Sequence, residues 1–170
     1  MSRMNRYHGK YRGKVFNNVD PEFLGRIQVI VPDVSALLPS TWALPCVPVP
    51  TLKGGVFALP EIEDDVWVEF ERGHPDHPIW VGGFWTPLTA PLTIPLANPA
   101  LPPIILSTVL QSAVIVSDSP IPPMTGPGVA VMATEVSFIS VSPEMIQIVS
   151  PTIQINGVTI VNDGALMVTL

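Results

Sequence analysis

DDVWVEFERGHPDHPIWVGGFW, residues 64–85, contains the pattern that decides the fold of the N-terminal half of the chain. Val66, Val68 and Phe70 alternate with polar and aromatic residues, and alternating positions of a β-strand point to opposite faces. HPDHP at 74–78 predicts a rigid turn. The PIWVGGFW that completes the stretch predicts a second strand, in which the glycines permit a sharp bend or close packing.

Short strands separated by turns continue toward the N-terminus. We expect a strand at 10–17, a turn rich in Asn, Asp, Pro and Gly, and a strand at 26–31 that Pro32 ends. WALPCVPVP at 42–50 is extended but contains three prolines, which suits a sheet edge or a loop. Five short strands in about 75 residues, without a convincing amphipathic helix, predict a closed β-barrel, most commonly an OB-like one.

Three motifs in this half carry a specific resemblance. DPEFLGRIQVIVP at 20–32, the P-x-x-x-D-x-V-W-V-x-F run at 60–70 and GHPDHPIWVGG at 73–83 occur in that order. Together they resemble the OB-fold domain of phage baseplate hub and spike proteins, including phage baseplate assembly protein V, of VgrG proteins, and of spike proteins in extracellular contractile injection systems. The resemblance covers roughly 8–86, and it departs from the family pattern at His74, where an acid is usual.

The resemblance implies structural roles for thirteen motif positions. These are Asp20, Pro21, Gly25, Arg26, Pro32, Pro60, Asp65, Trp67, Asp76, Pro78, Trp80, Gly82 and Gly83. We expect Trp67 and Trp80 to fill a barrel too small to hold a ligand. Asp76, between two prolines, is expected to accept backbone N–H bonds in its turn.

The C-terminal half has a different composition. All eight Lys and Arg residues precede position 73, whereas 86–170 contains four acids and twelve of the 21 prolines. Apolar residues recur every seven positions in its last part: Ile139, Ile146, Ile153, Ile160 and Met167. Helix breakers such as Ser-Pro and Asn-Gly interrupt each repeat, so short β-strands are expected instead of a coiled coil.

Such short strands are stable when they stack, and this half has almost no charge to cover an apolar face. We therefore predict a trimeric intertwined β-helix or β-prism needle at 129–170, with the five repeated apolar residues as candidates for its core. The fold class is all-β, with an N-terminal tail at 1–9, an OB barrel at 10–86 and a Pro-rich extended collar or linker at 87–128. We interpret the collar as extended chain wrapped on neighbouring subunits, to which 104–116 could add strands, and a disordered linker is the alternative.

Composition and spacing argue against chemistry. A net charge of −6 disfavours nucleic-acid binding, and no apolar run reaches the length of a bilayer span. His74 and His77 flank Asp76 in a stiff turn that lacks an evident third metal ligand. Cys46, in an apolar setting, is interpreted as a buried structural thiol. We expect no catalytic residue, cofactor or metal, and 86–128 is too short for the lysozyme domain that some relatives carry.

The resemblance implies a structural spike at the tip of a contractile injection machine that pierces a target envelope. Its partners would be two further copies of the chain, tube or hub and baseplate proteins at the OB end, and a PAAR-like tip protein at the C-terminal end, with transient contact with the target membrane. The chain would be made in the cytoplasm and become part of a phage tail or injection particle. The alternative is an OB-fold module that binds oligonucleotide or oligosaccharide, with an oligomerisation tail.

Overall fold

The computed structural model describes residues 5–52, 54–87, 89–90, 97–134 and 136–153. The chain forms two compact units, Met1–Thr89 and Ala90–Leu170, and each contains one five-stranded sheet. The fold is all-β, as predicted, and among the described residues the strands are accompanied only by a one-turn helix α1 (Pro32–Ser35) and a 3₁₀ turn η1 (Glu71–Gly73). No helix among the described residues has the length and apolar character needed to cross a bilayer.

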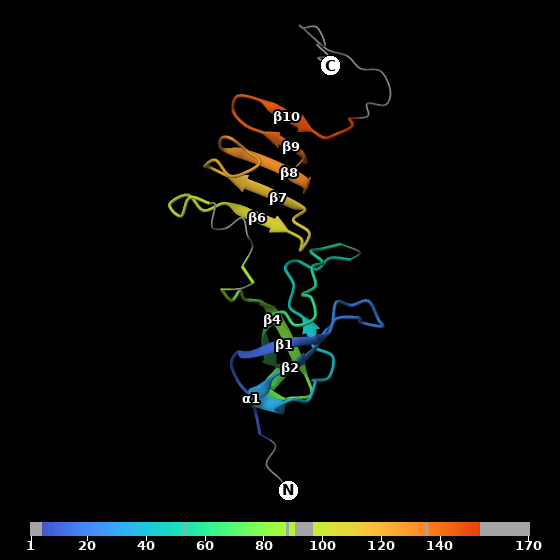
Figure 1. Cartoon of the computed structure of the whole chain (residues 1–170). Helices are drawn as coiled ribbons and strands as arrows, with labels where there is room; N and C mark the ends of the chain where they lie inside the picture. Colours follow the sequence, from blue (N-terminus) through green and yellow to red (C-terminus); the bar gives the residue numbers. More distant parts are fainter. Residues whose placement is uncertain (1–4, 53, 88, 91–96, 135, 154–170) are drawn as a thin grey trace. The chain divides into compact units, whose positions relative to one another are not determined.

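The first unit is an OB-like barrel (Figure 1). Its strands, in the spatial order β2-β1-β4-β5-β3, are β2 (Gln28–Ile30), β1 (Tyr11–Asn17), β4 (Asp65–Phe70), β5 (Pro78–Gly83) and β3 (Leu44–Pro45). Backbone hydrogen bonds between Ile27 and Ala43, with N···O distances of 2.7 and 3.2 Å, connect the two ends of this sheet. The sheet therefore curls back on itself, and the proline-containing β3 lies at its edge as expected.

Alternation along β4 builds the barrel core. Val66, Val68 and Phe70 are buried, whereas the residues between them are half-exposed. They pack with apolar residues from the rest of the barrel: Val15, Ile27, Val29, Val31, Ala43 and Trp80. The register between β4 and β5 shifts between Val66 and Val68 opposite Gly82, whose φ of 130° favours glycine.

The second unit is an antiparallel sheet in which consecutive strands are neighbours. Its strands are β6 (Ile104–Ser107), β7 (Ala113–Ser117), β8 (Gly128–Thr134), β9 (Ser137–Val141) and β10 (Ile146–Val149). Strands β6 and β7 fall inside the segment expected to be an extended collar. Strand β7 pairs with β8, which begins at position 128, where the collar was expected to end. Residues 104–117 of the expected collar therefore contain strands, because the prolines lie in the connections and not in these strands.

We predict that Ile27→Ala lowers the free energy of unfolding of the first unit by about 2–5 kcal/mol, because Ile27 is fully buried and a cavity would remain. Urea unfolding followed by tryptophan fluorescence measures this, since all four tryptophans lie within 42–85. Ile62→Ala is the matched control, because Ile62 is about half exposed. Equal losses for the two variants would contradict the assigned core.

Candidate assembly surfaces

One face of the second sheet is aliphatic and exposed. Paired residues of an antiparallel sheet lie on the same face, so the register assigns two ladders of side chains to this face. One ladder is Ile104, Val116, Val129, Val141 and Ile146, and the other is Leu106, Val114, Val131, Ile139 and Ile148. All ten are 40–70% exposed, and none is polar. We call this surface the bare face.

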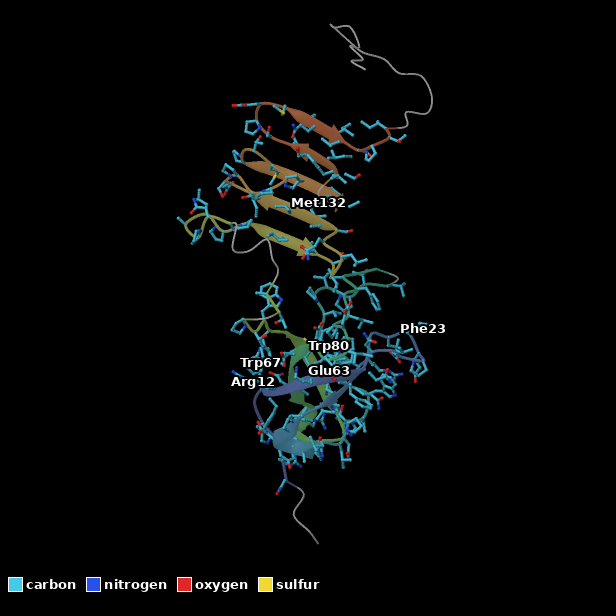
Figure 2. The ribbon with its side chains drawn as sticks, in the orientation of Figure 1. Arg12, Phe23, Glu63, Trp67, Trp80 and Met132 are labelled. Atoms are coloured by element: carbon cyan, nitrogen blue, oxygen red, sulfur yellow. The ribbon has the colours of Figure 1, made fainter. Side chains whose placement is uncertain are left out.

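The opposite face of the same sheet is covered by the chain itself. Ile115, Ala130 and Met132 are buried there, in one cluster with Ile121 and Met124 from the β7–β8 connection. A bridge between Ile121 and Met124, with an N···O distance of 2.8 Å, shapes that connection. Figure 2 labels Met132 on its strand. The chain thus buries one apolar face of the sheet and leaves the other without cover among the described residues.

Two of the five residues predicted for the needle core lie on the bare face, Ile139 in one ladder and Ile146 in the other. Ile153 is also about half exposed, but it lies beyond β10. Ile160 and Met167 lie outside the described residues. The sequence reasoning missed most of the bare face. The signal was an apolar residue at every second position in IILS, AVIVS and GVAVMAT, which a search for a seven-residue repeat does not detect.

Asp20 organises the loop between β1 and β2 in the barrel. Its buried carboxylate accepts hydrogen bonds from the backbone N–H groups of Glu22, Leu24 and Arg26, at 3.0, 2.8 and 3.2 Å. The guanidinium of Arg26 also binds this carboxylate, with 2.6 Å between Nη2 and Oδ1. A buried carboxylate with this many donors holds the loop in one conformation. We call this arrangement the Asp20 clasp.

The clasp is joined to the barrel by tryptophans. The guanidinium of Arg26 lies 5.5 Å from the centre of the Trp42 ring. Trp80 is buried in the core and donates from Nε1 to the carbonyl of Gly25 at 3.1 Å. The Arg26 hydrogen bond, supported by the backbone donors and opposed by burial, holds the pKa of Asp20 well below its ordinary value. The same hydrogen bond raises the pKa of Arg26.

Trp67 does not fill the barrel, and that prediction is wrong. It alternates with the buried residues of β4, so it lies on the outer surface, where its ring centre is 4.7 Å from that of Phe84. The guanidinium of Arg12 lies over both rings, at 5.6 and 5.4 Å from their centres. Trp80 does lie in the core, as expected. Arg12 therefore covers the Trp67 and Phe84 rings, which are two of the aromatic side chains that an OB-fold binding module could offer.

The other motif positions have structural contacts. Pro21 follows Asp20 in its loop, Pro32 begins α1, and Pro78 is the buried first residue of β5. The carbonyl of Pro60 accepts from Asn18 Nδ2 at 2.9 Å, and Asp65 pairs with Lys14 at 3.2 Å. Gly83 lies opposite Val66 in the ladder.

These contacts span the motifs on which the family resemblance rests. Residues 11–85 match the family model of the type VI secretion system/phage-baseplate injector OB domain. We call the matched part of the first unit the injector OB domain. No curated protein matches the chain. The family match ends before the second sheet begins. The role of the second unit is therefore argued from the geometry of the bare face.

Two further expectations about the injector OB domain are wrong. Asp76 is exposed, and hydrogen bonds between main-chain groups close its turn instead, with His77 N 3.0 Å from the carbonyl of His74. The backbone carbonyl of Asp76 accepts from Thr41 Oγ1 at 2.8 Å. Cys46 is exposed, because it follows the edge strand β3 and points away from the core. Among the described residues, no three His, Cys, Asp or Glu side chains converge as a metal site requires.

We predict that Asp20→Asn lowers the urea midpoint of the injector OB domain at pH 7, because Arg26 would lose its buried anionic partner. The lowered pKa of Asp20 also sets a pH dependence in the wild type. Its contribution is complete above the unfolded pKa of about 3.9 and is lost progressively as the pH falls below that value.

Urea titrations at several pH values between neutral and strongly acidic measure both effects. The Asp20→Asn variant should lose less stability on acidification than the wild type does. Asp33→Asn is the control, because Asp33 is exposed in the first turn of α1. An Asp20→Asn variant with wild-type stability at pH 7 would show that the clasp does not stabilise the domain.

Proposed function

We propose that this chain is the structural spike of a contractile injection machine, in which three identical copies form a rigid tip that pierces the target envelope. The single observation that carries the proposal is the bare face. An aliphatic surface of ten side chains without a polar group is unstable in water unless another apolar surface covers it. The injector OB domain in the same chain supports a place in such a machine.

A second copy of the chain is the partner that fits the bare face best. The face has no charge or hydrogen-bonding side chain that a different protein could recognise, so shape and apolar character alone determine what covers it. The same face of another copy has both properties and is present in equal amount. When copies associate through equivalent ladders, the ladders of all copies run along one axis that crosses the strands. This arrangement favours a prism.

The choice of three copies rests on the family resemblance of the injector OB domain. Three sheets with their bare faces turned inward make a closed prism with a dry core, and the covered faces then point outward. The winding of 129–170 into an intertwined needle belongs to the same proposal. Ile139 and Ile146 would be core residues of this prism, and Ile153, Ile160 and Met167 would continue its core.

The function of such an assembly is mechanical. The injector OB domains would meet the tube or hub and the baseplate, and the far end of the prism would meet a PAAR-like tip protein before transient contact with the target membrane. The matched family is a structural baseplate or injector domain, and we propose no catalytic, cofactor or metal chemistry for the chain. It would be made in the cytoplasm and built into a phage tail or an injection particle.

Val131→Asp tests the trimer. Val131 lies near the middle of the bare face, so the substitution would place a carboxylate in the core of the prism and dissociate the copies. Light scattering should give three times the chain mass of 18.3 kDa for the wild type and a single chain mass for the variant.

Val136→Asp is the matched control for this experiment. It makes the same chemical change at a valine of similar exposure, but in the turn between β8 and β9, outside the ladders. This variant should keep the mass of the wild type. A wild-type protein with the mass of one chain, or a Val131→Asp variant that remains a trimer, would overturn the proposed assembly.

The place of the chain in a particle can be tested by labelling. An epitope tag at the N-terminus, expressed in the organism that produces the particles, should direct gold-labelled antibody to the baseplate end of purified tails in electron micrographs. The label should be lost when the Val131→Asp substitution is added, because a chain that does not assemble is not incorporated. Label along the sheath, or none on intact particles, would contradict a spike.

A further inference from the structure

The injector OB domain has a second large apolar surface, formed by two loops. The loop between β1 and β2 exposes Val19, Phe23 and Leu24, and the loop after β3 exposes Val49, Leu52, Val56 and Phe57. Phe23 is 89% exposed and Leu52 is 95% exposed. We call these seven residues the loop patch. Figure 2 shows Phe23 at the outer end of its loop, pointing away from the barrel.

The two loops are neighbours in space. A Cβ atom at Gly25 would lie 3.4 Å from the Phe57 ring and 3.7 Å from side-chain atoms of both Leu59 and Pro45, so the loops touch beside Gly25. In Figure 1 the two loops leave the barrel on the same side. The loop patch therefore spans two loops that contact each other beside Gly25.

The first loop is held rigid for display. The Asp20 clasp fixes the backbone on both sides of Phe23, which has a φ of 56°, a conformation that costs energy for a residue with a side chain. Nothing within the described part of the chain covers the ring that is held in this way. The second loop is closed by paired hydrogen bonds between Thr51 and Gly54, at 2.8 and 3.2 Å. Rigid apolar side chains lose little conformational freedom on binding, which is what an anchor of an interface requires.

The loop patch is of interface size. An exposed large apolar side chain presents roughly 60–120 Å² of apolar surface, so seven present about 400–800 Å². A standard interface buries about 800 Å² on each partner. Of the charged residues in the two loops, Glu22 and Arg26 pair with each other at 3.1 Å, and Lys53 follows Leu52 in the sequence.

We propose that the loop patch is a second contact between copies of this chain. This inference rests on the proposed trimer. Once the bare faces bind, the OB domains are held at high effective concentration, which favours the second contact.

Cysteine cross-linking in the full chain tests the proposal. In a Cys46→Ser background, Phe23→Cys and Leu52→Cys are each treated with a short bismaleimide and separated on a denaturing gel. Both should give several-fold more covalent dimer than the control Leu37→Cys. Leu37 has a similar exposure and lies just after α1. Figure 1 places α1 at the opposite end of the unit from the second loop. Tryptophan fluorescence confirms that each variant is folded.

The outcomes separate this inference from the proposed function. A trimer by light scattering with preferential cross-linking at 23 and 52 supports it. A trimer in which those positions cross-link no more than position 37 overturns the loop contact and leaves the spike standing. A protein with the mass of one chain overturns both.

Discussion

A β-sheet that is apolar on both faces must be covered on both faces, and this constraint governs the second unit. The β7–β8 connection places Ile121 and Met124 over one face. On the other face, two ladders of Val, Ile and Leu are exposed. Burial of aliphatic surface is the main driving force of association in water, so the state with the bare face covered is the one that the composition of the sheet favours. Most of the low charge of the C-terminal half follows from this requirement.

The barrel solves a different problem, because it closes on itself and completes its own core. Its stability comes from the packing of Val66, Val68, Phe70 and their neighbours, and the Asp20 clasp then fixes the loop between β1 and β2 against that core. The clasp is a buried ion pair with backbone donors, an arrangement that favours one conformation over many. A closed barrel therefore displays stiff loops, and two of these loops carry the loop patch.

The sequence predicted the barrel correctly, but it predicted the surroundings of several individual side chains wrongly. Alternation in β4 identified the core strand, and the prolines of 42–50 favoured the edge or loop position in which β3 lies. The errors concern residues whose environment depends on which face is turned inward or outward. Trp67 was assigned to the interior although it alternates with Val66 and Val68, because its size suggested burial. Cys46 follows an edge strand, where an apolar sequence does not imply a buried side chain. Asp76 was given a capping role that hydrogen bonds between main-chain groups fulfil instead.

By itself, the sequence determined the all-β class, the injector OB domain, and a C-terminal half too apolar and too poor in charge to remain exposed as one chain. Only the tertiary structure decided which of the two apolar faces of β6–β10 the chain covers with its own residues. In AVIVS and GVAVMAT both sets of alternating positions are apolar, so periodicity cannot tell them apart. The choice depends on where the β7–β8 connection packs, a contact between residues distant in sequence, and that contact leaves the ladder of Val114, Val131 and Ile139 exposed.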